Sequence, residues 1–326
     1  MSGVEQFLLR SGHNRNAIHV GLVNNMPDTA LRATELQFAR LLKDAAGSLD
    51  VRLRLFSLGS IPRGDEVRAR MAGFYDDAAF LQAANIDALI VTGAQPGATD
   101  LRDEPYWGEL AHLIDWAQIG TISTLFSGLS AHAAVLHLDS IQRQSLARKL
   151  SGVYDSSRVE DDPLFFNTAA TVPVPHSRRY DIAQRDLVAK GYRVLARLDN
   201  DQVDIFTREP PGHSRFVFLQ GHPEYDSAIL GREFLRDMAQ FLEGETAERP
   251  SVPEHYFDRA TEIRLSELAG NGEPSLSRYQ EVVLGALPRQ LWRPHTMRLI
   301  SNWLMLVAAA KARHVSSKAV PTRRRA

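Results

Sequence analysis

The sequence contains no cysteine among its 326 residues. It can therefore form no disulfide, bind no metal through a thiolate and use no thiol as a nucleophile. Any covalent catalysis by this chain has to use another kind of side chain.

The chain also lacks an excess of charge of either sign. It has 38 Lys and Arg against 39 Asp and Glu, so no field of the whole protein singles out nucleic acid or an anionic membrane as a partner. Residues 311–326 are the exception, because they are rich in Lys and Arg and include three consecutive arginines. Without interleaved aromatic residues, this segment is expected to be a disordered, solvated tail. We expect small molecules as partners, held by local charges, and no nucleic acid or membrane.

Long hydrophobic runs are missing as well. No stretch approaches the roughly 20 apolar residues needed to span a bilayer, and the N-terminus lacks the apolar core and cleavage site of a signal peptide. The expected compartment is therefore the cytoplasm. Hydrophobic residues still make up 44% of the chain, which is enough to fill a sizeable core.

Short apolar runs alternate with segments of helical spacing in the first half. The predicted strands are 18–23, 51–55, 88–91 and 121–126, and the predicted helices are 36–42, 110–117 and 130–138. This alternation indicates an α/β fold with βαβ units and a mainly parallel sheet flanked by helices, in which ligands gather at the carboxyl ends of the strands. The loops after Val23, Val91 and Phe126 should lie together.

The second half predicts strands of more antiparallel character at 192–198, 203–207 and 216–219, then a helix at 229–242. The chain turns polar at 243–254, with two prolines, so the sheet domain is expected to end there. The predicted parts are an N-terminal arm at 1–17, a sheet domain at 18–245, a C-terminal helical extension at 246–310 that packs back on the domain, and the basic tail at 311–326.

A strand, a sharp turn and a helix at 124–134 have the pattern of a nucleophile elbow. In that setting the helix N-terminus can stabilise a developing oxyanion, which points to acyl-transfer chemistry. A tight strand-to-helix turn with no catalytic role would also contain glycine and serine. The pattern alone therefore leaves both interpretations open.

A second candidate follows the predicted strand at 216–219. His222 could act as a base near neutral pH, and Glu224 could accept the proton of its other ring nitrogen and fix the tautomer. The alternative is the capped start of a helix with a surface histidine.

Taken together, several motifs resemble the homoserine O-succinyltransferase family over roughly residues 18–305. They are, in order, residues 22–42, VTGA at 91–94, STLF at 123–126, KLSGVY at 149–154, PHSR at 175–178, GHPEYD at 221–226, EFLRD at 233–237 and SNWL at 301–304. The resemblance implies a class I glutamine-amidotransferase-like fold. It also implies transfer of an acyl group from coenzyme A to the hydroxyl of homoserine, in methionine biosynthesis, with acyl-CoA as a co-substrate. We expect a homodimer with no bound cofactor and no metal.

The same resemblance implies roles for individual residues. His222 matches the family's general base and Glu224 matches its partner, while Lys149, Ser177 and Arg236 match substrate-binding positions. The two cations would suit the carboxylate of an amino acid or of an acyl group. Surface salt bridges are the alternative for these charged positions.

Gly97 falls where glycine in the family accompanies succinyl donors and glutamate accompanies acetyl donors. A glycine leaves room for a succinyl carboxylate and adds no opposing charge. The resemblance therefore favours succinyl-CoA over acetyl-CoA.

The sequence departs from the family at the nucleophile, because Gly128 occupies the position of the catalytic cysteine. Glycine adopts the positive-φ conformation of an elbow without cost, so the turn can persist without the side chain. Ser130, at the helix N-terminus, is the better candidate for a replacement nucleophile, and Ser127 is a weaker one. Direct transfer without a covalent intermediate is the other possibility.

A further departure lies in the loop after Met26, where Asp28 and Thr29 replace a pair of lysines, and the lost positive charge would weaken the grip on an anionic group. Two functions remain open at this point. The first is an acyltransferase acting on homoserine or a related hydroxy amino acid. The second is a catalytically silent binding or regulatory protein that keeps the pocket. A glutaminase or peptidase ranks below both, because those enzymes of the same fold also need the cysteine.

Overall fold

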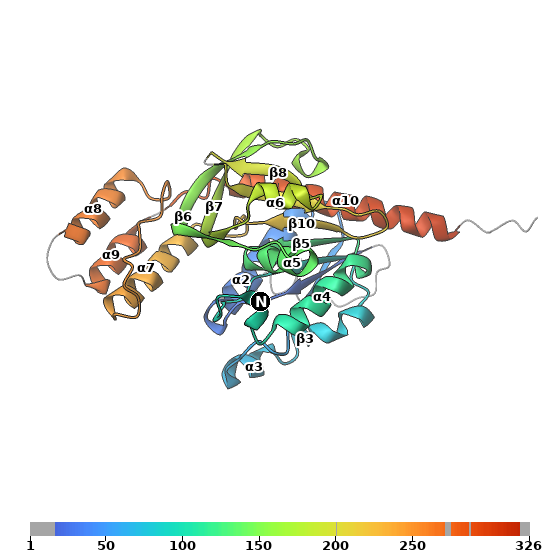
Figure 1. Cartoon of the computed structure of the whole chain (residues 1–326), viewed down its shortest axis with the longest axis horizontal. Helices are drawn as coiled ribbons and strands as arrows, with labels where there is room; N and C mark the ends of the chain where they lie inside the picture. Colours follow the sequence, from blue (N-terminus) through green and yellow to red (C-terminus); the bar gives the residue numbers. More distant parts are fainter. Residues whose placement is uncertain (1–16, 200, 271–274, 287, 320–326) are drawn as a thin grey trace, which may run out of the picture.

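The computed structural model describes residues 17–199, 201–270, 275–286 and 288–319. Within them a single mixed sheet of ten strands has the order β3-β2-β1-β4-β5-β10-β9-β8-β6-β7, with helices on both faces (Figure 1). The predicted α/β class is confirmed.

The first half of the sheet is parallel, as the sequence predicted. Its strands are β1 (Ile18–Val23), β2 (Val51–Ser57), β3 (Tyr75–Asp77), β4 (Ala88–Val91) and β5 (Ser123–Ser127). Every residue of β4 and β5 is buried, which is why these strands appear in the sequence as continuous apolar runs rather than as alternating ones. The loops that follow β1, β4 and β5 consequently meet at one edge.

Two hydrophobic cores lie on the two faces of the sheet. On one face, α2 (Asp28–Ala45) and α10 (Arg293–Ala319) share a core with β1 and β2. On the other face, α4 (Trp107–Gly120) and α5 (Leu129–Asp139) pack against side chains such as Phe126 and Phe218. Short helical elements lie in the segments between these strands and helices, namely α3 (Asp65–Met71), η1 (Ala78–Ala83), η2 (Leu101–Asp103), η3 (Pro163–Phe165) and α6 (Gln184–Ala189).

The second half of the sheet is largely antiparallel. β10 (Arg215–Leu219) runs parallel to β5 and antiparallel to β9 (Val203–Arg208), and β9 is antiparallel to β8 (Arg193–Leu198). The sequence did not predict the long hairpin of β6 (Gln144–Arg158) and β7 (Thr171–Asp181). Most of β6 is exposed or half-buried, so its side chains carry no strand periodicity that a sequence pattern could reveal.

The C-terminal helices separate into two groups. α8 (Arg259–Gly270) and α9 (Leu276–Gly285) form a third core with α7 (Ile229–Leu242) and lie beside it at one end of the molecule (Figure 1). By contrast, α10 returns to the sheet, where Trp303 Nε1 donates to Ser123 Oγ at 2.9 Å.

The expected disordered tail at 311–326 is corrected in part, because α10 continues to Ala319. At the start of the expected tail, Lys311 Nζ donates to Asp87 Oδ2 at 2.7 Å. Residues 320–326, and residues 1–16 of the predicted N-terminal arm, lie outside the described residues. Among the helices that are described, none is both long and apolar enough to cross a membrane.

Candidate active site

The turn between β5 and α5 has the geometry of an elbow. Gly128 has φ 61° and ψ −124° and directly precedes α5, and its N–H donates to the carbonyl of Leu219 on the neighbouring strand at 2.8 Å. Residues with a side chain rarely adopt this conformation, whereas glycine does so readily. The elbow predicted from the sequence is therefore present without a side chain at its tip.

The imidazole of His222 lies directly beside this glycine. A methyl group added to Gly128 would lie 2.8 Å from Cε1 of His222 and 3.3 Å from Nε2. The ring thus fills part of the space that a nucleophile's side chain would need. It stands at the N-terminus of α5, where the first backbone N–H groups of a helix have no partner within the helix.

His222 is held from three sides. Its Nδ1 lies 2.9 Å from Oε1 of Glu224, and its backbone N–H donates to the carbonyl of Pro175 at 2.8 Å. Its ring stacks on Tyr225, with centroids 4.4 Å apart and planes at 10°. Glu224 occupies Nδ1, and the edge of the ring that faces the elbow is the one formed by Cε1 and Nε2.

Charge and burial act on His222 in opposite directions. Burial lowers its pKa, but the carboxylates of Glu224 and Glu233 raise it by more, so the pKa lies above its ordinary value. Glu233 is linked to the ring through Tyr225, whose hydroxyl donates to Glu233 Oε1 at 2.8 Å. Neither Tyr225 nor Glu233 has a role that follows from the sequence, although both lie in motifs that carry the resemblance.

Neither candidate serine is hydrogen-bonded to His222. Ser130 Oγ donates to the carbonyl of Val91 at 2.7 Å and to that of Ser127 at 3.0 Å. Ser127 Oγ donates to Glu224 Oε1 at 3.3 Å. In this geometry Ser130 ties the helix start to β4, and Ser127 supports the carboxylate that orients the imidazole.

A second buried imidazole–carboxylate pair lies behind the loop that carries His222. His176 Nε2 is 3.2 Å from Asp204 Oδ1, and Ser156 Oγ donates to Asp204 Oδ2 at 2.5 Å. A side chain at Gly221 would meet both members of the pair at 2.9 Å. Together with Val174, the pair leaves no room for a side chain at Gly221. The sequence signals for the pair are a carboxylate among the buried residues of β9 and a histidine in the PHSR motif at 175–178.

The two cations predicted to bind substrate meet on one carboxylate. Lys149 Nζ on β6 lies 2.7 Å from Asp237 Oδ2, and Arg236 Nη2 on α7 lies 2.7 Å from Asp237 Oδ1. Ser177 lies on β7, in register with Ser151 of β6. The structure thus brings Lys149 and Arg236 together, and it adds Asp237, for which the sequence predicted no role.

Gly97 lies in the exposed part of the loop after β4. A methyl group added there would meet no atom within 4 Å. Next to it, the Ala98 N–H donates to Glu104 Oε1 at 2.6 Å, and Arg143 Nη2 donates to the carbonyl of Thr99 at 2.8 Å. The loop is thus tied to two other segments while the space beside Gly97 stays open.

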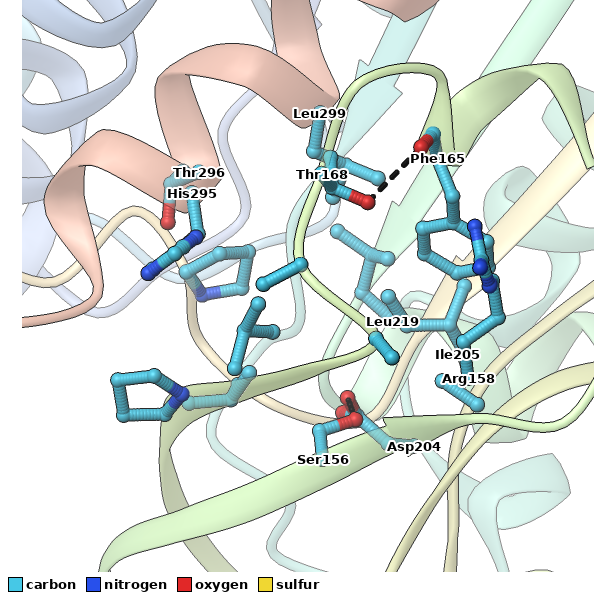
Figure 2. A pocket seen from close by; sticks show the side chains of 17 residues that line it. Ser156, Arg158, Phe165, Thr168, Asp204, Ile205, Leu219, His295, Thr296 and Leu299 are labelled. Carbon is cyan, nitrogen blue, oxygen red and sulfur yellow. Dashed lines mark hydrogen bonds between the residues drawn. The ribbon is translucent and has the colours of Figure 1, made fainter.

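A pocket of about 560 Å³, including its open mouth, has Pro223, the residue after His222, in its lining. Figure 2 shows the side chains that line it. Its walls come from η3, from β6–β10 and from the first turns of α10. At its floor Ser156 is hydrogen-bonded to Asp204 (Figure 2). The pocket does not include His222, Glu224 or Gly128, so it is separate from the site built around the elbow.

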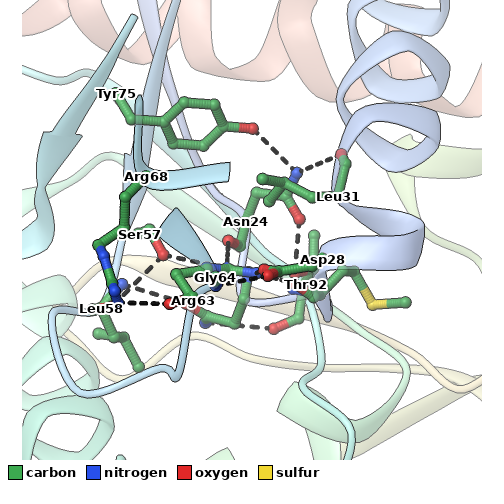
Figure 3. A network of polar contacts seen from close by, with 12 residues as sticks. Asn24, Asp28, Leu31, Ser57, Leu58, Arg63, Gly64, Arg68, Tyr75 and Thr92 are labelled. Atoms are coloured by element: carbon green, nitrogen blue, oxygen red, sulfur yellow. Dashed lines mark hydrogen bonds and ion pairs between the residues drawn. The ribbon is translucent and has the colours of Figure 1, made fainter. Parts of the chain in front are cut away.

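The loop after β1, where the family resemblance fails, is held by an arginine from the loop after β2 (Figure 3). Arg63 Nη1 lies 3.2 Å from Asp28 Oδ1, and Arg63 Nη2 donates to Ser57 Oγ at 3.2 Å. The other oxygen of Asp28 accepts from the Gly64 N–H at 2.7 Å. Asp28 is therefore a structural anchor, and the buried Arg63 is engaged within the protein instead of standing in for the missing lysines.

Among the residues that the structure describes, no group of three or more His, Asp and Glu side chains could hold a metal ion. What the site offers is an imidazole–carboxylate pair, a helix N-terminus and a cluster of two cations with one carboxylate. This set of groups suits acid–base chemistry on an anionic substrate.

Comparison with known proteins gives one consistent family. The family model described as homoserine O-succinyltransferase matches residues 10–313. A homoserine O-succinyltransferase from Rhodopseudomonas palustris is 46% identical over 300 residues, covering 90% of this chain and 89% of the relative. One from Thiothrix nivea is 36% identical and covers 88% of this chain and 81% of the relative.

Solved structures agree on the fold. The crystal structure of a glutamine amidotransferase from Methylobacillus flagellatus is similar with a TM-score of 0.50 at 12% identity, covering 89% of this chain and 95% of that chain. At this identity the likeness shows the fold alone, which is the glutamine-amidotransferase-like fold expected from the sequence.

Proposed function

The chain belongs to the homoserine O-succinyltransferase family, and from that premise we propose that it transfers an acyl group from a coenzyme A thioester to the hydroxyl of homoserine or a related hydroxy amino acid, in methionine biosynthesis. The observation that carries the proposal is the His222–Glu224 pair beside the N-terminus of α5. The open space beside Gly97 favours succinyl-CoA over acetyl-CoA as donor. Because coenzyme A thioesters are charged molecules that do not diffuse through membranes, we place the reaction in the cytoplasm. We propose that the active protein is the homodimer expected from the sequence.

The proposed transfer is direct. Nε2 of His222 takes the proton of the acceptor hydroxyl, while Glu224 holds the Nδ1–H and stabilises the imidazolium that forms. The hydroxyl oxygen attacks the thioester carbonyl, whose oxygen becomes negative near the first N–H groups of α5. When the tetrahedral intermediate collapses, the C–S bond breaks and the imidazolium returns the proton to the departing coenzyme A thiolate. No side chain at position 128 is needed for this sequence.

The cluster of Lys149, Arg236 and Asp237 is proposed to bind the amino-acid end of the acceptor. Asp237 can take the ammonium group, while the two cations take a carboxylate. We expect Lys149→Ala and Arg236→Ala each to weaken ligand binding by about 1.5–3 kcal/mol, since each removes one charge-assisted contact. Isothermal titration with homoserine and with succinyl-CoA measures the loss.

Arg148→Ala is the matched control for these two variants. Arg148 is the neighbour of Lys149 but is 70% exposed and pairs with Glu254, so its loss should leave affinity unchanged. Unchanged affinity in both Lys149→Ala and Arg236→Ala would make these residues ordinary surface charges.

The raised pKa of His222 predicts the pH dependence of the rate. A general base must be neutral, so kcat/KM should rise with pH, with a midpoint above about 6.5, the ordinary value for histidine. Glu224→Gln removes the main group that raises the pKa, whereas the burial that lowers it remains. The acidic limb of this variant should therefore move to lower pH, in addition to the loss of rate. An acidic limb that does not move would show that Glu224 does not act on the titrating group.

A silent binding protein is the second candidate, and Gly128 is the observation that favours it. Incubating the pure protein with homoserine and either succinyl-CoA or acetyl-CoA, and following release of free coenzyme A, separates the two functions. Release that depends on homoserine supports the acyltransferase. Binding of the same ligands without any release would support the silent protein.

A further inference from the structure

The imidazole of His222 lies flat against the ring of Tyr225. The two ring centroids are 4.4 Å apart and the planes are nearly parallel, at 10°. Glu224 already orients the imidazole through Nδ1, so the stack adds a second constraint, on the plane of the ring. The face of an aromatic ring carries partial negative charge and attracts a cation. The contact therefore suits an imidazole that becomes an imidazolium when it takes a proton.

Tyr225 is itself held at its hydroxyl and at its backbone. The hydroxyl donates to Glu233 Oε1 at 2.8 Å, and burial raises the pKa of Tyr225, so the phenol keeps its proton for this bond. The backbone carbonyl accepts from Trp292 Nε1 at 2.8 Å and from Gln290 Nε2 at 2.7 Å. These contacts fix both ends of the residue that supports the imidazole.

Trp292 connects this support to the C-terminal extension. It is 1% exposed, and together with Tyr225 it belongs to the third hydrophobic core, which contains residues of α7, α8 and α9. Trp292 and Gln290 lie 67 and 65 residues after Tyr225 in the chain. A core formed largely by helices outside the sheet thus reaches the base through one aromatic ring.

We propose that Tyr225 is a positioning residue for acyl transfer, and that the C-terminal extension holds it in place through Trp292 and Gln290. The inference rests on the proposed role of His222 as general base and adds residues that act through it. Before transfer, the tyrosine ring keeps the imidazole against the elbow. Once the imidazole has taken the proton of the acceptor, the face of the ring stabilises the positive charge until the proton passes to the departing thiolate. Tyr225 itself forms and breaks no bond.

Tyr225→Leu removes the ring and keeps a buried apolar side chain. Loss of the stack should lower kcat for coenzyme A release about tenfold and leave KM nearly unchanged, because the groups proposed to bind substrate remain. Tyr225→Phe keeps the ring and should recover most of the rate. An equal loss in both variants, or no loss in Tyr225→Leu, would overturn the role of the stack.

Nuclear magnetic resonance tests the stack even if the wild type transfers nothing. The Cε1–H signal of His222, assigned by its absence in His222→Ala, should lie upfield because of the ring current of Tyr225. Tyr225→Leu should cancel this upfield shift, and Tyr225→Phe should keep it. An unshifted wild-type signal would overturn the inference without touching the proposed transfer.

The same signal reports the pKa of His222. The titratable and charged groups that act on His222 come from its own loop, α7, β6 and β7, namely Glu224, Glu233, Lys149 and His176. All of them remain in Tyr225→Leu, and leucine keeps the ring buried. Because the stack favours the charged imidazole, its loss should lower the pKa of His222 and move the acidic limb of kcat/KM to lower pH. An unchanged pKa would contradict the proposed stabilisation of the imidazolium.

Trp292→Phe tests the part played by the C-terminal extension. It removes the N–H that holds the carbonyl of Tyr225, so we expect kcat to fall about threefold or more and the upfield shift of the His222 signal to diminish. The reason is that the supporting ring is no longer fixed at its backbone.

Trp303→Phe is the matched control. Trp303 is equally buried, at 1% exposure, but its Nε1 donates to Ser123, the first residue of β5, at the end of that strand away from the elbow. This variant should lower the melting temperature and leave both the kcat and the His222 signal unchanged. Equal changes in Trp292→Phe and Trp303→Phe, measured well below both melting temperatures, would reduce Trp292 to a packing residue and overturn the role of the extension.

Discussion

Replacing His222 by alanine is expected to abolish acyl transfer while leaving the fold intact. His222 is the only base that the described structure places at the elbow, and loss of a positioned general base typically costs about 10²–10⁴ in rate. Its side chain is bonded to Glu224 and stacks on Tyr225 instead of filling one of the hydrophobic cores. The rate of coenzyme A release measures the first effect, and circular dichroism with thermal unfolding checks the second.

His137 provides a matched control. His137 also pairs with a carboxylate, since its Nε2 lies 2.8 Å from Asp115 Oδ1, but it sits in the last turn of α5, away from the elbow. His137→Ala should therefore keep its activity. Near-full turnover in His222→Ala would remove the imidazole from the mechanism, whatever the control shows.

The sequence predicted the parts of the fold that local patterns determine. β4 and β5 are buried on both faces, so they appear as apolar runs, and α7 shows its apolar stripe at helical spacing. The β6–β7 hairpin escaped prediction because its stability comes from pairing between strands and not from an alternating pattern. The extension of α10 to Ala319 was missed because a basic composition is compatible with a helix as well as with a tail.

The same distinction holds for the site. His222 and Glu224 are two residues apart in one loop, so their pairing could be expected from the sequence. His176 and Asp204 come from different strands, and the meeting of Lys149 and Arg236 on Asp237 joins a strand to a helix. Only the folded chain reveals such contacts. The position of the imidazole against Gly128 is also a tertiary fact, because the sequence showed only that a side chain was missing.

Gly128→Ala is expected to cause a loss of activity comparable to that of His222→Ala, although it adds a single methyl group. That methyl would lie 2.8 Å from His222 Cε1, so the ring must move away from the elbow. The positive φ of 61° adds strain of about 1–3 kcal/mol for any residue with a side chain. Kinetics together with thermal unfolding separates the two effects, since strain lowers the melting temperature and displacement of the ring lowers the rate.

Gly97→Ala is the control for Gly128→Ala. A methyl group at Gly97 meets nothing within 4 Å, so this variant should keep the activity of the wild type on a short donor such as acetyl-CoA. Full activity in Gly128→Ala would mean that the imidazole does not need its present position against the elbow.

Mass analysis of the protein after a quenched reaction with acyl-CoA alone shows whether the transfer passes through a covalent acyl-enzyme. Direct transfer predicts no adduct, and it predicts that Ser130→Ala stays active, because Ser130 is occupied by the carbonyls of Val91 and Ser127. An ester on the peptide that contains Ser130, lost together with turnover in Ser130→Ala, would make that serine the nucleophile.

Gly128→Cys then tests whether the site still accepts a thiol. Intact-mass analysis after incubation with acyl-CoA should show a thioester if His222 can give way to the new side chain. If that variant forms no thioester and the parent protein releases no coenzyme A with any hydroxy amino acid, the acyltransferase proposal fails and the silent binding protein is left.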